Sequence, residues 1–267
     1  EESQLGRVAD PAGGAWFTET LAEGLAKAAW AEFQKIESEG GLAASLVSDA
    51  LQARISAVRD ARAKDIARRK IPLTGVSEYP LLEEIGAPVA EVMPPKPKAV
   101  SDAGLKHFVK TLPAPGADVS AEALVPVRLA APFEALRDAA AKAAKPPAVF
   151  IATLGSLAEF TPRADFARNA FAAGGITSKE APVPPRDAAE LAAAFRAYGA
   201  KLAVLCGTDK GYEAGAIEAA AALKKAGAAR VWLAGKFEGD GIDANLFAGA
   251  DILHLLKLAH AELGVAQ

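Results

Sequence analysis

One uninterrupted apolar run, Ala148–Leu154, constrains the fold of this chain more than any other feature. It reads Ala-Val-Phe-Ile-Ala-Thr-Leu and lies between Pro146-Pro147 and Gly155. A run of this length, bounded by turn residues, is typical of a central strand in a parallel sheet that is covered on both faces. We therefore expect it to form the middle of an open α/β domain, with a ligand-binding loop directly after its carboxyl end.

Strands and helices alternate from this run to the C-terminus. Thr161 is predicted to cap the first helix, with Pro162 at the first helical position, where no backbone donor is needed. The predicted helices are 161–173, 186–198, 212–226, a short turn near 245–247 and a last helix to 263; the predicted strands after the first are 176–181, 202–206, 230–234 and 251–253. Five strands with right-handed crossovers predict a flavodoxin-like, doubly wound α/β sheet in the order 2-1-3-4-5.

Turn and capping residues predict a helical N-terminal region. Residues 10–14 contain Asp-Pro and Gly-Gly pairs that favour turns. A helix is predicted over 17–36, with Thr20 and Glu23 as a capping box and the glycine pair 40–41 as its end. The sequence therefore begins with a turn and one amphipathic helix whose apolar face must be covered.

A second helical region is predicted over Leu42–Lys70. Its apolar positions, expected inside, are Leu46, Leu51, Ile55, Val58 and Ile66. The basic run 68–70 is interpreted as a solvated helix end in preference to a phosphate grip. Residues 73–79 are predicted to form a strand or extended arm, 81–127 a proline-rich linker, and 132–141 a helix that leans on the following domain.

Composition excludes several classes of function. The 267 residues suffice for roughly two domains, and about half of them are apolar. The net charge is −3, and acidic and basic residues are interspersed, so the sequence has no basic patch suited to nucleic acid or an anionic membrane. The single cysteine, Cys206, excludes an internal disulfide framework and fits a reducing compartment. Without a signal-like or spanning segment, the chain is expected to be cytoplasmic, and its start at Glu1 without methionine is compatible with a longer gene product.

Few side chains are candidates for chemistry. The three histidines, His107, His254 and His260, are interpreted as partly exposed structural residues because their spacing does not suit a metal site. Cys206 is interpreted as a buried apolar group, and Glu159 as a weak general-base candidate without a partner. Asp209 and Lys210 fit either a ligand contact or a helix-capping turn.

Several segments are similar to methylmalonyl-CoA mutases. Those that resemble the end of the substrate barrel and the helical linker of these enzymes are Gln4–Gly14, Trp16-Phe17, Ile36-Glu37 before Gly40-Gly41, and Leu73–Pro80. Residues 148–267 resemble their cobalamin-binding domain. The segments that look like the small, or beta, subunit of the heterodimeric bacterial enzyme are Arg128–Arg137, Ala152–Ser156 and Phe166–Ile176.

The loop after the first strand departs from the pattern of the catalytic subunits. They carry D-x-H-x-x-G there, in which the histidine is the lower axial ligand of cobalt, the aspartate holds its other ring nitrogen and the glycine makes room for the nucleotide tail. Aligned on Gly155, the corresponding residues are Leu157, Glu159 and Pro162. Leucine cannot orient a ligand, and glutamate offers a hard oxygen where imidazole is wanted. The resemblance therefore implies lost cobalt ligation and no cofactor on this chain.

The resemblance also implies an organisation into three parts. Residues 1–80 would be the end of a TIM-barrel-type substrate domain with a helical segment, 81–147 a proline-rich linker with its leading helix, and 148–267 a cobalamin-binding-like domain. The chain would be the C-terminal portion of a non-catalytic small subunit, with no catalytic or metal-binding residues, that supports a large subunit carrying adenosylcobalamin. The residues expected at the subunit interface are Asp10, Pro11, Gly13, Gly14 and Trp16.

Two other functions are compatible with the sequence. One is a mutase subunit that binds cobalamin through unusual ligation. The other is a flavodoxin-like module that binds a nucleotide or phosphate through the loops 155–161 and 206–211, although these loops lack a glycine-rich phosphate cradle. A visible spectrum after exposure to hydroxocobalamin separates the first from the structural role, and a thermal-shift screen with nucleotides tests the second.

Overall fold

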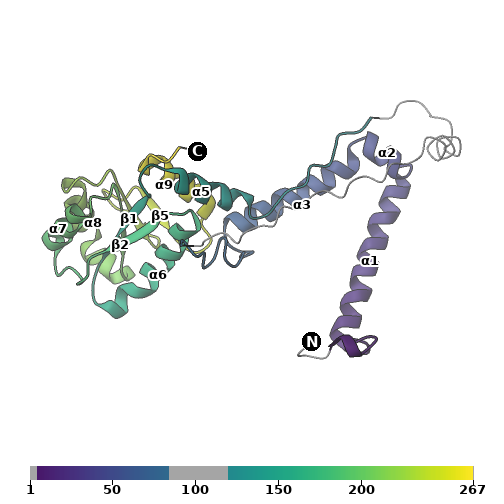
Figure 1. Cartoon of the computed structure of the whole chain (residues 1–267), viewed down its shortest axis with the longest axis horizontal. Coiled ribbons are helices and arrows are strands. Elements are labelled where there is room, and N and C mark those ends of the chain that lie inside the picture. Colours follow the sequence, from purple (N-terminus) through teal and green to yellow (C-terminus); the bar gives the residue numbers. More distant parts are fainter. Residues whose placement is uncertain (1–4, 84–119, 267) are drawn as a thin grey trace, which may run out of the picture. The chain divides into compact units, whose positions relative to one another are not determined.

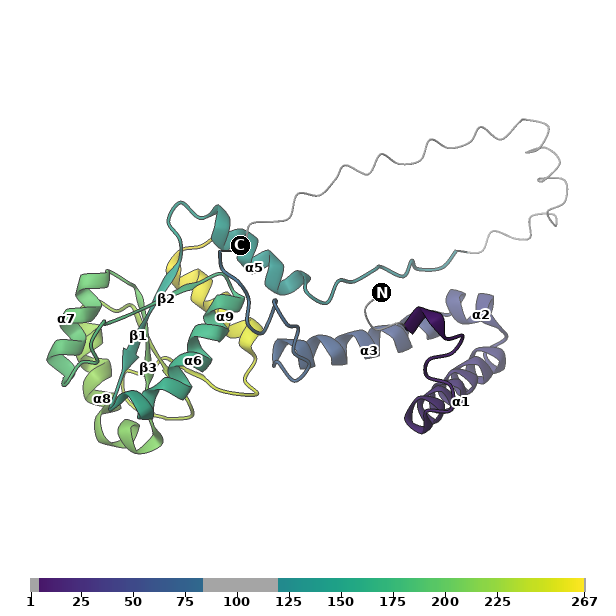
Figure 2. The same ribbon diagram turned by 60° about the horizontal axis from the view of Figure 1, so that its bottom comes forward.

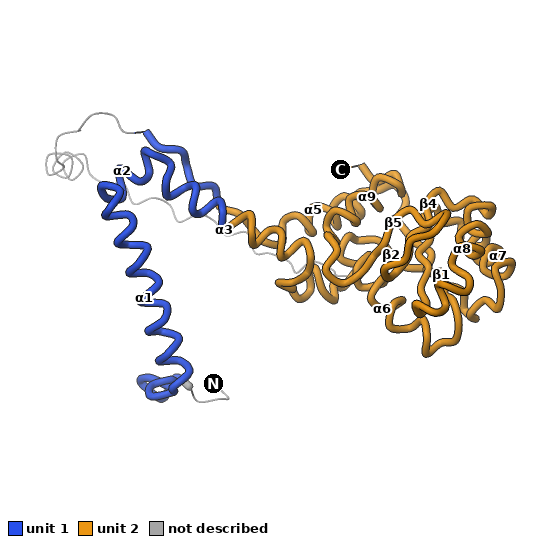
Figure 3. Tube along the Cα trace, turned by 180° about the vertical axis from the view of Figure 1, so that it is seen from behind, with its two compact units in different colours: residues 1–58, 92–125 blue, residues 59–91, 126–267 orange. Residues whose placement is uncertain are grey.

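The structure, a computed structural model, describes residues 5–83 and 120–266. The chain divides into two compact units, one comprising residues 1–58 and 92–125 and the other residues 59–91 and 126–267 (Figure 3). The boundary between them falls inside one helix, α3 (Ala50–Ala67).

The larger unit is built on a parallel sheet of five strands (Figure 1). The strands are β1 (Ala148–Thr153), β2 (Thr177–Glu180), β3 (Leu202–Cys206), β4 (Arg230–Ala234) and β5 (Ala244–Leu246). Their order is β2-β1-β3-β4-β5, and every neighbouring pair is parallel. This confirms the flavodoxin-like α/β sheet that the sequence predicts. The apolar run forms β1, an interior strand between β2 and β3, and the strand at the centre of the sheet is β3.

Helices cover both faces of the sheet (Figure 2). One face carries α5 (Ala131–Lys142), α6 (Leu157–Ala173) and α9 (Ile252–Leu263), and the other carries α7 (Ala188–Tyr198) and α8 (Asp209–Lys225). Successive strand residues point to opposite faces, so within β1 the side chains of 149 and 151 pack in the first core and those of 150 and 152 in the second. Helix α5 does lean on the domain that it precedes, as predicted.

The C-terminal end of the sheet differs from the prediction. The fifth strand is β5, where a helical turn was expected, and the segment expected to be the strand instead begins α9. Asp251 caps that helix, because its carboxylate accepts a hydrogen bond from the backbone N–H of His254 at 2.9 Å. Asp243, directly before β5, holds that strand in register with β4. Its carboxylate accepts from the N–H of Val231 at 2.7 Å, and its own N–H donates to the carbonyl of Val231 at 2.8 Å.

The smaller unit contains a 3-10 turn, η1 (Leu5–Arg7), and helices α1 (Trp16–Ser38) and α2 (Leu42–Val47). The expected capping box at Thr20 and Glu23 is wrong, because α1 begins at Trp16 and both residues lie inside it. Its end at the glycine pair is confirmed: Gly41 has a φ of 89° and its N–H donates to the carbonyl of Ile36 at 3.0 Å.

The second helical region is confirmed and consists of two helices, α2 and α3. Asp49 adopts a left-handed conformation with a φ of 59°, which separates α2 from α3. Its apolar positions are not uniformly inside: Ile66 is 3% exposed, but Ile55 and Val58 are 42% and 60% exposed. Helix α1 has no buried residue at all. The amphipathic pattern of these helices thus leaves apolar side chains exposed on the described chain.

Residues 73–79 form a compact turn with a single bridge between Thr74 and Glu78, not a strand or arm. Arg69, which follows α3, holds this turn against α6. Its side chain is 5% exposed and donates to the carbonyl oxygens of Ser77, at 2.6 Å from Nε, and Asn169, at 3.2 Å. The Asn169 amide in turn accepts from the N–H of Tyr79 and donates to Glu78, both at 2.7 Å. The basic run is therefore not wholly a solvated helix end.

We expect Arg69→Ala to lower the free energy of unfolding by about 2 to 4 kcal/mol, because it leaves the buried Ser77 carbonyl and the partly buried Glu78 carboxylate without their donor. The matched control is Arg68→Ala, since Arg68 is exposed. That change should alter stability by less than about 0.5 kcal/mol. Urea unfolding measures both, and equal effects would contradict the assigned role of Arg69.

His260 is fully buried, in contrast to the partly exposed histidine expected from the sequence. Its Nε2 lies 2.7 Å from the carbonyl oxygen of Gly174, and its Nδ1 is buried without a partner among the described residues. Burial lowers the pKa of His260, and the hydrogen bond to Gly174 opposes that shift in part. The neutral ring, with its proton on Nε2, satisfies this geometry, whereas the imidazolium would bury a second donor. His254 is exposed, and His107 lies outside the described residues.

Because the folded pKa of His260 lies below its unfolded value of about 6.5, the unfolded chain binds more protons in acid. Stability should therefore fall as the pH drops below about 6.5, and level off for this group below the folded pKa. His260→Gln, which keeps a donor for Gly174, should flatten the dependence of Tm on pH between about pH 5 and 7, whereas His254→Gln should not. Identical pH profiles for the two variants would show that His260 is not the titrating group.

Candidate active-edge region

The segment after β1 is a helix start, not an open loop. Only Leu154, Gly155 and Ser156 connect β1 to α6, which begins at Leu157. The Glu159 carboxylate accepts hydrogen bonds from the backbone N–H and the hydroxyl of Ser156, each at 2.7 Å, and so forms a capping box. These two hydrogen bonds lower the pKa of Glu159, and the one from the Ser156 hydroxyl has the larger effect. This carboxylate is engaged as a cap, which weakens its case as a general base.

The expected helix start at Thr161 and Pro162 is wrong. Both residues lie inside α6, because Ser156 and Glu159 provide an earlier cap. Pro162 cannot donate a backbone hydrogen bond, and the Thr161 hydroxyl donates instead to the carbonyl of Leu157 at 2.5 Å. The three positions that correspond to aspartate, histidine and glycine in the resembled loop are thus helical, and Leu157 is 67% exposed.

The crevice between the carboxyl ends of β1 and β3 is closed. Sheets of this order bind ligands there, where the chain leaves adjacent strands for opposite faces. The N–H of Leu154 donates to the carbonyl of Cys206 at 2.8 Å, which continues the strand pairing one residue beyond β1. A Cβ atom placed on Gly207 would lie 3.1 Å from both the Cβ and the carbonyl oxygen of Leu154. Leu154 and Gly207 therefore pack directly together across the crevice.

Tyr212 and Arg163 cover the adjoining edge above β3 and β4. The Tyr212 hydroxyl accepts from the N–H of Gly207 at 2.9 Å and donates to the carbonyl of Ala234 at 2.7 Å. The Arg163 guanidinium lies over its ring, with Cζ 4.9 Å from the centroid, and binds Asp209 at 2.6 Å. Burial raises the pKa of the Tyr212 hydroxyl. This cluster was missed in the sequence because its members come from two helices and share no motif.

The remaining sequence candidates have structural roles. Cys206 is fully buried, and desolvation raises the pKa of its thiol to about 12, so it is not a nucleophile near neutral pH. Asp209 is in the first turn of α8, whose cap is Thr208, and Lys210 is exposed. Over the described ranges, no group of three or more histidine, cysteine or acidic side chains could hold a metal ion.

Several surface hollows belong to the larger unit. One, of about 290 Å³, lies beside Leu154 and Gly155 after β1, and residues of α7 and α8 complete its lining. Another, of about 420 Å³, lies at the carboxyl ends of β4 and β5 and is lined in part by Arg163 and Lys236.

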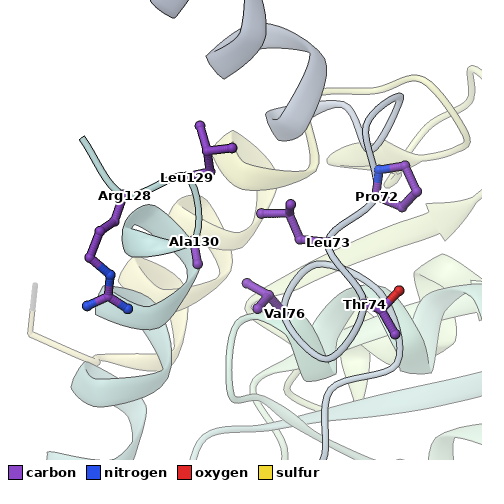
Figure 4. A pocket seen from close by; sticks show the side chains of 7 residues that line it. All are labelled: Pro72, Leu73, Thr74, Val76, Arg128, Leu129 and Ala130. Atoms are coloured by element: carbon purple, nitrogen blue, oxygen red, sulfur yellow. The ribbon is translucent and has the colours of Figure 1, made fainter. Parts of the chain in front are cut away.

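A groove of about 500 Å³ lies between the turn after α3 and the residues before α5. Figure 4 shows Leu73 and Val76 directed into this groove and Arg128 directed away from it; Arg128 binds Glu134 at 2.6 Å. The groove is lined mainly by apolar groups and offers little for chemistry.

The residues at the sheet edge do not fit a cobalt corrinoid. An axial ligand would have to come from Glu159, whose carboxylate already binds two donors of Ser156. The slot for a nucleotide tail would require open space above Gly235, but a Cβ atom placed there would lie 2.9 Å from Nη1 of Arg163. Removing the capping carboxylate and the guanidinium from these contacts would cost the hydrogen bonds that they make. No mechanistic step through a corrinoid follows from this geometry.

The fold and this edge define a flavodoxin-like α/β domain in which Leu154 and Gly207 pack together across the crevice between β1 and β3. A sequence profile described as methylmalonyl-CoA mutase matches residues 1–161. The methylmalonyl-CoA mutase small subunit of Streptomyces virginiae is 43% identical over 270 residues, which cover 100% of this chain and 40% of that protein. The small subunit of Propionibacterium freudenreichii subsp. shermanii is 35% identical over 276 residues, covering 100% and 39%. The probable small subunit of Mycobacterium tuberculosis H37Rv is 38% identical over 241 residues, covering 88% and 34%.

The chain belongs to the methylmalonyl-CoA mutase family. It spans about 40% of the length of the curated relatives in Streptomyces and Propionibacterium. Among the described residues, no helix is long and apolar enough to span a bilayer.

Proposed function

We propose that this chain is the C-terminal part of a non-catalytic small subunit of a heterodimeric methylmalonyl-CoA mutase. The holoenzyme would interconvert methylmalonyl-CoA and succinyl-CoA, as in propionate metabolism, with adenosylcobalamin held by a large subunit. The observation that carries the proposal is the start of α6. The capping box of Ser156 and Glu159 makes a helix of the segment that aligns with the cobalt-ligand loop of catalytic subunits. The similarity to small subunits of the family supports it.

The role of the chain in this proposal is structural support of the large subunit. The residues proposed for the interface are Asp10, Pro11, Gly13, Gly14 and Trp16, which form the turn before α1 and its first residue. Trp16 is 82% exposed, and the turn is ordered by backbone bonds such as Gly13 N–H to Asp10 carbonyl at 3.2 Å. An exposed tryptophan on a preformed turn is suited to bury against a partner. We also propose a cytoplasmic location, because the one cysteine is buried and unpaired.

The proposal is tested by measuring how many corrins remain bound per protein molecule. The isolated chain, and its complex with a large subunit that carries D-x-H-x-x-G, are mixed with hydroxocobalamin, desalted and examined by visible spectroscopy. We expect no corrin on the isolated chain, because no axial ligand is free at Glu159. We expect one corrin per complex, held by the large subunit.

The matched variant is Leu157→Asp with Glu159→His and Pro162→Gly, which restores the ligand pattern. It should still retain little corrin, because Arg163 continues to occupy the space above Gly235. Circular dichroism verifies that each protein is folded. A shifted corrin spectrum on the unaltered chain, or a second corrin in the complex, would refute the structural role.

A further inference from the structure

A cleft at the carboxyl ends of β4 and β5 combines charge with aromatic surface. It has a volume of about 420 Å³, within the usual range of about 300 to 1,000 Å³ for small-molecule sites. Its walls come from α6, from the first turn of α8 and from the segments that follow β4 and β5. The polar side chains on these walls are Arg163, Asp209 and Lys236, and the aromatic ones are Phe166 and Phe247.

The cationic groups of the cleft are not fully neutralised. Arg163 binds Asp209 through Nη2 at 2.6 Å, but its Nη1 is buried with no hydrogen-bond partner among the described residues. The Lys236 ammonium lies over the ring of Phe247, with Nζ 4.7 Å from the centroid. Two cations against one carboxylate leave the cleft with an excess positive charge. An incoming anion would meet the Lys236 ammonium as a point charge, and it would reach the Arg163 guanidinium by displacing Asp209 from Nη2.

We propose that this cleft binds a phosphomonoester of a planar aromatic compound, of the size of a mononucleotide. The phosphate dianion lies between Arg163 and Lys236, where it competes with Asp209 for the guanidinium. A phosphate presents more charge and more acceptor oxygens than one carboxylate, so it is the stronger partner for arginine. The ring of the ligand packs on Phe166 or Phe247, both of which are half-buried and line the cleft.

This proposal does not depend on the role of the chain in a mutase. It uses residues outside the segment that corresponds to the cobalt-ligand loop, and it requires no metal or redox chemistry.

The test is isothermal titration of the whole chain with AMP, with adenosine and with inorganic phosphate. We expect AMP to bind, inorganic phosphate to bind more weakly, and adenosine to show no binding, because the phosphate provides the charge and the ring provides the apolar contact. Lys236→Gln should weaken AMP binding by about tenfold, the usual consequence of losing one charged contact. Asp209→Asn should tighten it, because the competing carboxylate is removed. Lys225→Gln, at an exposed position in the last turn of α8, is the matched control and should bind AMP unchanged.

Lys236→Gln and Asp209→Asn are expected to change AMP affinity in opposite directions, so a general loss of folding cannot account for both results. Absence of AMP binding at millimolar concentration would overturn the proposal, as would Lys236→Gln and Lys225→Gln binding AMP equally. Inorganic phosphate binding as tightly as AMP would overturn the assignment of an aromatic ligand. AMP binding that Asp209→Asn weakens would overturn the competition between carboxylate and phosphate.

Discussion

The capping of α6 by Ser156 and Glu159 is the interaction on which the character of this domain depends. A carboxylate at the third helical position binds the donors at the helix start, so only three residues separate β1 from the helix. The negative charge also lies at the positive end of the helix dipole, which adds to its stability. One pair of side chains thereby converts the segment that resembles a cobalt-ligand loop into a regular helix.

The rest of the sheet edge is consistent with that helix start. Once α6 begins early, its next turn places Arg163 over Tyr212 and beside Gly235. Tyr212 then ties the ends of β3 and β4 together through its hydroxyl, and Leu154 packs on Gly207 across the usual crevice. Packed and hydrogen-bonded groups thus fill the contact between the ends of β1 and β3. Hollows remain beside the loop after β1 and beside β4 and β5.

Most of the fold could be predicted from the sequence, because its strands and helices follow from local patterns of apolar and turn-forming residues. Strand β1 is a continuous apolar run, and the alternation of short strands with helices leaves few topologies for a parallel sheet. Strand β5 was missed because it has only three residues, of which only Leu246 is buried. The break between α2 and α3 could not be predicted, because no proline or glycine marks it. It depends on the left-handed backbone conformation of Asp49.

The closed edge was only half predictable. The loss of histidine at Glu159 could be seen in the sequence, but the helix start could not, because Thr161-Pro162 is the more familiar signal for one. The cluster of Arg163, Tyr212 and Asp209 joins residues far apart in the chain. Such contacts are set by how α6 and α8 pack on the sheet, and no spacing within a single segment reveals them.

Amide hydrogen exchange of the segment from Leu154 to Arg163 distinguishes a helix start after β1 from an open loop. The N–H groups of Glu159 and Phe160 donate to the carbonyl of Ser156 at 2.9 and 3.2 Å. We expect slow exchange from these residues onward, with no change when hydroxocobalamin is added. Exchange as fast as in an unstructured peptide, or marked slowing on addition of the corrinoid, would show that the segment is an open loop able to take the ligand.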